Sequence, residues 1–318
     1  MKFLKRAVAL AAACTTLVSG PSYADKPATI IVPYGAGGTV DISARIVAQG
    51  LSEAGKTAIV ENRAGGGGVI GWGAAAKAAP DGQTLLMIDT SFAMAEALLP
   101  GLPFDPKKDF AQITTVAKVP YVMVVTPSLP VKSVKELIAL SKAKPGSIYY
   151  GSGGTGSSTH LGAELFQSLS GADITHVPYK GAAAAMQDLM GGQVQVLFTA
   201  IPTALPHIKS GKLRALMVSS AKRVALLPDV PSAPEAGVPK MIADNWVGLA
   251  VPGATSKEIM AKWHKDIAVA LKAPASHKRF EELGLTVVAN SPAEAAGFVG
   301  SEIKRWGDLV GSNKIKPE

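Results

Sequence analysis

Two glycine-rich segments have the residue types and spacing of anion-binding loops. Pro33–Asp41 and Gly151–His160 each follow a run of β-branched or aromatic residues, and each leads directly into a helical pattern. Glycine lets backbone N–H groups face a ligand without hindrance from a Cβ atom, and the N-terminus of the next helix adds partial positive charge. One such loop is equally well explained as a tight turn with a helix cap. The occurrence of two, one in each half of the chain, predicts that they face one cleft and hold a small carboxylate or phosphate.

Charged side chains beside these loops are predicted to support them rather than to bind the ligand. Asp41 ends the first loop, where its charge would repel a carboxylate, so we interpret it as a helix cap or a loop brace. Arg45 follows one helical turn later, at the spacing of an ion pair with Asp41. The helix Ser158–Leu169 is predicted to follow the second loop, and we expect His160, in its first turn, to make capping and polar contacts there. A third glycine segment, Glu61–Gly68, is predicted either to brace the first loop or to close the cleft.

Other motif matches fail on their structural context. Gly50–Thr57 fits the phosphate-loop pattern G-x-x-x-x-G-K-[ST], but a helical pattern precedes it and a strand follows, which reverses the order that phosphate binding needs. We therefore interpret Gly55 as the end of a helix. The glycines of Gly151–Gly156 fit a dinucleotide fingerprint, yet the acidic residue Asp173 precedes the next strand instead of ending it. The five His residues lack metal-ligand spacing and there is a single Cys, so we predict no cofactor and no metal.

The enzymatic alternative is a cleft hydrolase with Ser158 as nucleophile and His160 as base. Both residues lie at the start of one helix, and no third residue is evident that would orient the base. We therefore predict that the protein is not an enzyme.

Short strand-like runs alternate with helical patterns along the chain. The first half contains, in order, Ala28–Tyr34, Asp41–Ala54, Thr57–Glu61, Val69–Ala79 and Thr84–Asp89, and the pattern resumes after Tyr121–Thr126. Capping boxes that begin at Ser133, Thr255 and Ser291 mark three later helices. This order builds βαβ units, so we predict two α/β lobes, each a mostly parallel sheet flanked by helices. Lobe 1 is expected to comprise residues 25–126 and 244–318, and lobe 2 residues 127–243, with a hinge at the two crossings and the ligand between the lobes.

The composition and the N-terminus indicate an exported globular protein. Its 318 residues carry a formal net charge of +8 that is scattered, with no basic block of the kind that binds nucleic acid or a membrane surface. Met1–Arg6 is basic, Ala7–Val18 is apolar but too short to cross a bilayer, and Ser22–Ala24 offers the small residues of a cleavage site. We expect residues 1–24 to be a signal peptide, cleaved after Ala24, and the mature protein to be periplasmic. A lipoprotein acylated at Cys14 is the alternative.

The mature chain resembles the Bug family, the periplasmic solute-binding proteins of tripartite tricarboxylate transporters. The similarity covers essentially its whole length, and the motifs are specific when taken together and in order. They are Pro33-Tyr34-x-x-Gly37-Gly38-x-x-Asp41-x-x-Ala44-Arg45, Val60-Glu61-Asn62-Arg63-x-Gly65, Pro80-Asp81-Gly82-x-Thr84-Leu85, Tyr150-x-Ser152-x-Gly154-x-Gly156-Ser157-x-x-His160-Leu161, Val177-Pro178-Tyr179-Lys180-Gly181 and Pro228-Asp229-Val230-Pro231.

The resemblance implies a hinge-bending receptor with a two-lobed, type II-like binding-protein fold that closes on a small carboxylate. The loop residues that it assigns to ligand binding are Tyr34, Ala36, Gly37, Gly38 and Thr39 in the first loop and Ser152, Gly154, Ser157, Ser158 and Thr159 in the second. Further positions expected to face the cleft are Thr90 and Ser91, Thr199 and Ala200, each pair after a strand, and Asn245 at the return hinge. The implied partner is an integral-membrane permease, and we expect the receptor to be a monomer. A ligand-sensing receptor for a signalling partner is the alternative, and the class of carboxylate is left open.

Overall fold

The structure is a computed structural model that describes residues 27–99 and 101–312. The predicted signal peptide and Cys14 lie outside these residues. Within the described ranges, no helix is both long and apolar enough to cross a membrane.

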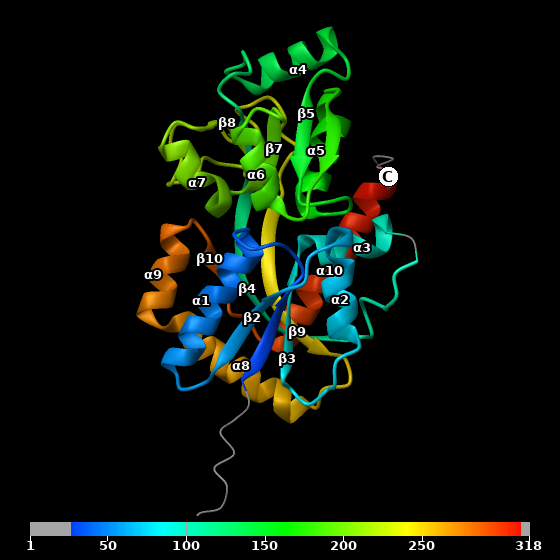
Figure 1. Cartoon of the computed structure of the whole chain (residues 1–318), viewed down its shortest axis with the longest axis vertical. Coiled ribbons are helices and arrows are strands. Elements are labelled where there is room, and N and C mark those ends of the chain that lie inside the picture. The colour runs from blue at the N-terminus through cyan, green and yellow to red at the C-terminus, as the bar shows by residue number, and fades with distance from the viewer. Residues whose placement is uncertain (1–26, 100, 313–318) are drawn as a thin grey trace, which may run out of the picture.

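The strands form one continuous sheet that runs through two lobes (Figure 1). Its strands are β1 (Ala28–Val32), β2 (Ala58–Asn62), β3 (Thr84–Asp89), β4 (Phe110–Val125), β5 (Tyr149–Ser152), β6 (Thr175–Pro178), β7 (Val196–Ala200), β8 (Arg214–Val218), β9 (Asp244–Pro252) and β10 (Thr286–Val287). The order along the main path is β2-β1-β3-β9-β4-β7-β5-β6, and β8 and β10 both pair with β4. The strands β2, β1 and β3 are mutually parallel, as are β7, β5 and β6, which is the arrangement that βαβ units produce.

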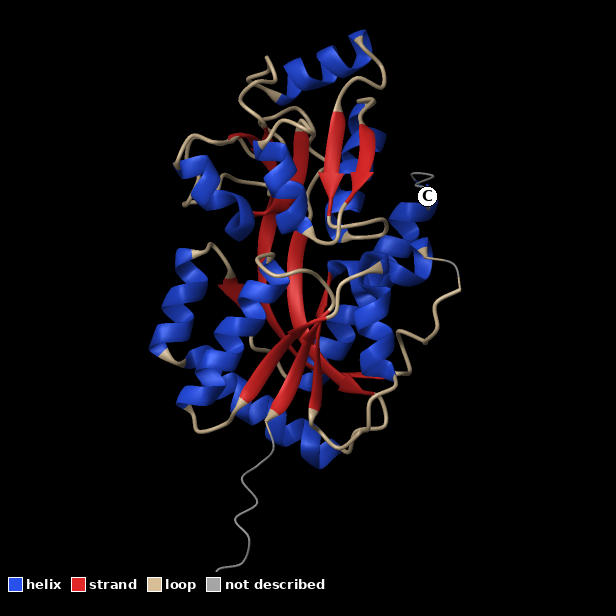
Figure 2. Cartoon of the chain, in the orientation of Figure 1, coloured by secondary structure: helices blue, strands red, loops and turns tan. Residues whose placement is uncertain are grey.

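Helices flank the sheet in both lobes (Figure 2). They are α1 (Thr39–Glu53), α2 (Val69–Ala76), α3 (Thr90–Leu98), α4 (Val134–Ala143), α5 (Ser158–Ser170), α6 (Ala182–Met190), α7 (Ile201–Lys209), α8 (Lys257–Lys272), α9 (Pro274–Glu282) and α10 (Pro292–Ser312), with a short 3₁₀ turn, η1, at Gly66–Gly68. The predicted end of the first helix is confirmed, because α1 stops at Glu53 and Gly55 has a φ of 78°. The predicted cap at Thr255 is wrong by one residue. The hydroxyl of Ser256 accepts the hydrogen bond from the N–H of Ile259 and so caps α8.

The long strands β4 and β9 connect the two lobes (Figure 1). The first part of β4, Phe110–Pro120, pairs with β9, whereas its last part, Tyr121–Val125, pairs with β7 and β8 of the upper lobe. One strand therefore belongs to the sheet of both lobes. The exact boundaries at residues 126 and 244 remain predictions.

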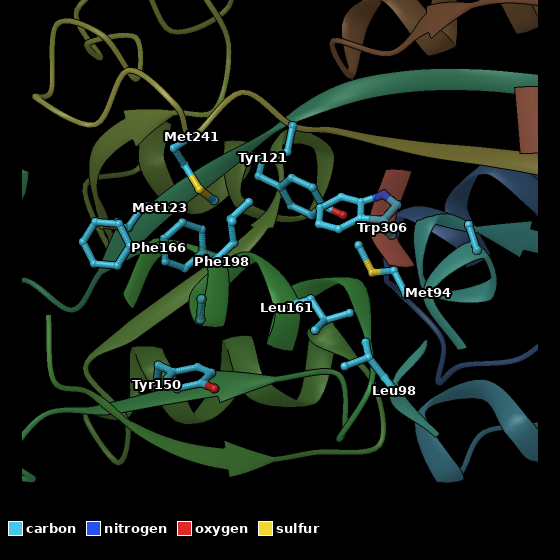
Figure 3. Close-up of a cluster of buried hydrophobic side chains, with 14 of the residues drawn as sticks. Met94, Leu98, Tyr121, Met123, Tyr150, Leu161, Phe166, Phe198, Met241 and Trp306 are labelled. Atoms are coloured by element: carbon cyan, nitrogen blue, oxygen red, sulfur yellow. The ribbon is translucent and has the colours of Figure 1, made fainter. Parts of the chain in front are cut away.

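A cluster of buried apolar side chains also joins the lobes. It includes Met94 and Leu98 of α3, Leu161 of α5, Tyr121 of β4 and Trp306 of α10 (Figure 3). Burial of apolar surface is the main favourable term in folding, so the lobes are held on this side by more than the two linking strands.

Candidate functional site

A cavity lies between the lobes, a position at which small-molecule sites are often found. It is lined by Tyr34, Gly35, Gly38, Thr39, Val40, Asp41, Asp89, Ser91, Gly153, Ser157, Ser158, Thr159, Ala182, Thr199, Ala200, Thr203 and Asn245. Most of these residues lie at or beside the N-termini of five helices, α1, α3, α5, α6 and α7, whereas Asn245 belongs to β9. Because a helix N-terminus presents unpaired N–H groups and partial positive charge, the cavity is suited to an anion without needing a basic side chain.

The first glycine loop is fixed by hydrogen bonds to Asp41. The Asp41 carboxylate accepts hydrogen bonds from the N–H of Gly37 at 2.9 Å, from Asn62 Nδ2 at 2.9 Å and from the guanidinium of Arg45 at 3.0 Å. The predicted ion pair with Arg45 is therefore present. Burial alone would raise the pKa of Asp41, but the hydrogen bonds from Arg45, Gly37 and Asn62 outweigh it and lower the pKa below its usual value.

The third glycine segment braces the first loop and also contacts the other lobe. Asn62 braces the first loop, because its Nδ2 also donates to the Tyr34 carbonyl oxygen at 2.9 Å. The glycines that follow face the other lobe. A Cβ built at Gly67 would lie 2.1 Å from the Thr155 carbonyl oxygen, so the two loops touch through their backbones.

The second glycine loop is held by hydroxyl groups of its own residues. The N–H of Gly153 donates to Thr159 Oγ1 at 2.7 Å, and Thr159 Oγ1 lies 3.0 Å from Ser157 Oγ. Ser157 is also the N-cap of α5, since its Oγ accepts from the N–H of His160. These bonds keep the loop in one shape while its residues Ser157–Thr159 line the cavity.

His160 and His176 lie behind this loop. His160 Nδ1 accepts from the N–H of Gly156 at 3.2 Å, and its ring stacks on that of His176 with 4.1 Å between centroids. Ser152 Oγ lies 2.6 Å from His176 Nε2. This arrangement braces the backbone of the loop, and neither ring lines the cavity.

Three direct contacts cross between the lobes at the cavity. The N–H of Gly35 donates to the Lys180 carbonyl oxygen at 3.2 Å, the N–H of Ser158 donates to Ser91 Oγ at 2.7 Å, and Thr39 Oγ1 lies 3.2 Å from Thr203 Oγ1. The lobes are therefore in contact around the site.

Asp89 is a buried carboxylate in the wall of the cavity. Its oxygens accept from the Tyr34 hydroxyl at 3.0 Å and from the Ser91 hydroxyl at 2.9 Å. Burial raises the pKa of Asp89 to about 6, and the hydrogen bonds from Ser91 and Tyr34 oppose this rise without cancelling it. Burial, together with the nearby Asp89, also raises the pKa of Tyr34 well above its usual value.

The structure brings ten of the predicted ligand-binding residues to the cavity. These are Tyr34, Gly38, Thr39, Ser91, Ser157, Ser158, Thr159, Thr199, Ala200 and Asn245. The other five, Ala36, Gly37, Thr90, Ser152 and Gly154, do not line it. Thr90 and Ser91 follow the strand β3, as predicted, and are the first residues of α3. Thr199 and Ala200 were predicted to follow a strand, but they are the last residues of β7.

Seven lining residues were not predicted to bind the ligand: Gly35, Val40, Asp41, Asp89, Gly153, Ala182 and Thr203, of which Asp41 was predicted as a support of the first loop. Gly35 and Gly153 lie inside the predicted loops, so the same glycine pattern could have identified them. Thr203 belongs to α7, a helix with Pro202 in its first turn and Pro206 in its interior, which the helical periodicity does not reveal. Among the described residues, no group of three or more His, Cys, Asp or Glu side chains is arranged to hold a metal ion.

Residues 43–315 match the family model described as "Tripartite tricarboxylate transporter family receptor". The chain belongs to this receptor family. Protein BugT of Bordetella pertussis is 39% identical to the receptor over 296 residues, which cover 92% of this chain and 91% of BugT. The structure of Rpa4515 of R. palustris with adipate superposes with a TM-score of 0.88 at 34% identity, covering 92% of this chain and 98% of the other. MatC of Rhodopseudomonas palustris with bound malate gives a TM-score of 0.87 at 31% identity, with 89% and 98% covered.

These similarities confirm the resemblance to the Bug family and the two-lobed periplasmic binding-protein fold predicted for the receptor. The family consists of solute receptors rather than enzymes.

Proposed function

We propose that the receptor captures a small carboxylate in the interlobe cavity by hinge closure and delivers it to a membrane permease of the tripartite tricarboxylate type. The ligand-binding residues of this proposal are the ten predicted residues that line the cavity. The protein acts in the periplasm after removal of residues 1–24.

The observation that carries the proposal is the convergence of five helix N-termini on one cavity that contains no Lys, Arg or His among its described lining residues. N–H groups and hydroxyls bind a carboxylate through charge-assisted hydrogen bonds, and the partial charges of the helix ends add to them. Adipate in Rpa4515 and malate in MatC support a small aliphatic carboxylate as the ligand class.

Closure follows from the position of the cavity between the lobes. A ligand that touches α1 and α3 on one side and α5 and α7 on the other binds the closed state more tightly than the open state, so it shifts the population toward closure. The strands β4 and β9, which connect the lobes, are the proposed hinge. The closed surface would then be recognised by the permease.

A melting-temperature screen of residues 25–318 against mono-, di- and tricarboxylates tests the binding proposal, with the matching neutral amides as controls. A ligand at 100 times its Kd adds about 2.7 kcal/mol to the free energy of unfolding. We expect a shift with one class of acid and none with its amide. Equal shifts with acid and amide, or no shift with any acid after refolding to remove retained ligand, would contradict the proposal.

Uptake of the labelled ligand tests delivery. In cells that produce the receptor, uptake is expected to disappear when the membrane subunits of the transporter are deleted and to return when they are restored. Tight binding with uptake unaffected by the deletion would favour the ligand-sensing receptor instead.

A further inference from the structure

The charged side chains among the described residues that line the cavity are acidic. Asp41 and Asp89 are the charged residues among those described there, and they differ in their partners. Asp41 is neutralised by its ion pair with Arg45, whose guanidinium is 3.0 Å away. Asp89 accepts from the neutral hydroxyls of Tyr34 and Ser91. An anion site of this kind would be expected to lack a carboxylate that no cationic side chain neutralises.

Asp89 is placed at the cavity by the junction of β3 and α3. It is the last residue of β3 and the N-cap of α3, and only 2% of its surface is exposed. The N–H groups of Ser91 and Phe92 favour its ionised form, yet burial dominates and holds its pKa near 6. Burial therefore destabilises the ionised carboxylate, and no Lys, Arg or His among the described residues that line the cavity offsets this.

The anion-binding and acidic groups of the site are immediate neighbours. One hydroxyl, Ser91 Oγ, donates to Asp89 Oδ2 at 2.9 Å and accepts from the N–H of Ser158, at the N-terminus of α5, at 2.7 Å. A ligand carboxylate near the start of α5 would thus lie beside a buried negative charge. A second carboxylate placed there would be repelled, whereas a cationic group would supply the charge that Asp89 lacks.

We infer that the preferred ligand is a carboxylate that also bears a protonated amino group, and that Asp89 receives this group while the helix N-termini bind the carboxylate. The inference rests on the proposed function, because it assigns the ligand class of the same cavity. Tyr34 and Ser91, which orient the Asp89 carboxylate, are positioning residues for the amino group.

Lowering the pH is expected to change the affinity in opposite directions for the two ligand classes, the aminated carboxylates and the plain dicarboxylates. The titratable groups that face Asp89 are the phenols of Tyr34 and Tyr121, whose pKa values are raised by burial, so both stay neutral. The charged group across the cavity is Asp41, paired with Arg45, and its pKa is lowered. Protonation of Asp89 therefore dominates between pH 7.5 and 5.5. It weakens the binding of an aminated ligand and strengthens the binding of a plain dicarboxylate.

Calorimetric titration with matched pairs of acids tests the inference. Succinate and L-aspartate, glutarate and L-glutamate, and adipate and L-2-aminoadipate differ within each pair by one amino group. At pH 7.5 we expect the aminated member of the bound pair to bind at least tenfold more tightly, and Asp89→Asn to abolish or reverse this preference. Asp188→Asn is the matched control, because Asp188 also accepts from a tyrosine hydroxyl, that of Tyr179 at 2.7 Å, but lies outside the cavity.

Each result decides the question. Tighter binding of the plain acids by the wild type, or a preference that Asp89→Asn leaves unchanged, would overturn the inference and leave carboxylate capture intact. If Asp89→Asn does not fold, the wild-type titrations at pH 7.5 and 5.5 decide, and a ratio of affinities that does not fall with pH contradicts the inference. If no carboxylate of any kind binds, the proposed function itself fails.

Discussion

The side-chain hydroxyl of Ser91 accepts a hydrogen bond of 2.7 Å from the backbone N–H of Ser158 in the other lobe. Both residues are buried, Ser91 in the first turn of α3 and Ser158 at the start of α5. The bond uses one of the N–H groups that a helix leaves unpaired at its N-terminus. It can form only when the lobes approach, so it links the geometry of the site to closure.

Replacing Ser91 by Ala removes this bond and is expected to weaken ligand binding. A buried hydrogen bond contributes about 1 kcal/mol, which corresponds to about a fivefold loss of affinity if it is lost from the closed state. Calorimetry with the best ligand from the melting screen measures the change. Ser43→Ala is the control, because the Ser43 hydroxyl is buried in α1 and has no hydrogen-bond partner among the described residues. Equal affinities in the two variants would show that the Ser91 bond does not support binding.

Gly67→Ala is expected to oppose closure without entering the cavity. Gly67 has a φ of 64°, and a Cβ there would lie 2.1 Å from the Thr155 carbonyl oxygen of the other lobe. The lobes would have to separate, so we predict a loss of ligand affinity of about tenfold or more. Small-angle scattering of the ligand-bound protein should give a larger radius of gyration than for the wild type.

Gly66→Ala provides a matched control for this variant. Gly66 has a similar φ of 58°, but its Cβ would meet only Val69 of its own lobe, at 3.4 Å. Both substitutions thus carry the same backbone strain, and only Gly67→Ala adds an interlobe clash. If both variants bind the ligand equally well, contact between these loops is not needed for closure.

Gly38→Val is expected to block the ligand while preserving the fold. Gly38 lines the cavity, its φ of −81° suits any residue, and no protein atom lies within 4 Å of a Cβ built there. The melting temperature without ligand should stay close to that of the wild type, and affinity should fall at least tenfold because the side chain occupies the space of the ligand. Unchanged affinity in Gly38→Val would exclude the first loop from the site.

Gly154→Val differs, since Gly154 has a φ of 120° and its Cβ would lie 3.0 Å from the Tyr179 carbonyl oxygen. That variant should lose stability.

Sequence patterns predicted the elements that alternate regularly and missed those without a clear period. The strand Thr84–Asp89 and the start of α5 at Ser158 were predicted to the residue, because turn and cap residues bound them. The first part of β4 was not predicted. Thr114, Thr115 and Lys118 interrupt its apolar pattern, although the strand is largely buried between β9 and its other neighbours.

The candidate site, too, was predicted from the sequence only in part. The glycine loops identified one residue set from each lobe, since glycine, serine and threonine before a helix have a local physical meaning. Asp89 was not predicted as a site residue because it is the last residue of a predicted strand, and α3 begins at the next residue with no loop between them. Its role depends on which distant groups surround it, namely Tyr34 and the start of α5, and that is set by the tertiary fold.

Arg45→Met is expected to lower stability at neutral pH by removing the strongest partner of Asp41. The pKa of Asp41 is lowered in the folded protein, so its stabilising contribution is present above the unfolded pKa of about 3.9 and is lost as the pH falls through the folded value. Arg45 is half-exposed, which limits the expected loss to about 1 kcal/mol. Urea unfolding at pH 7 should reveal this difference from the wild type, and the difference should narrow as the pH is lowered toward 3. Arg279→Met is the control, because Arg279 and Glu282 are both exposed, and it should change stability by less than about 0.5 kcal/mol. A loss for Arg45→Met that is the same at both pH values would mean that Arg45 stabilises the loop through packing rather than through the charge of Asp41.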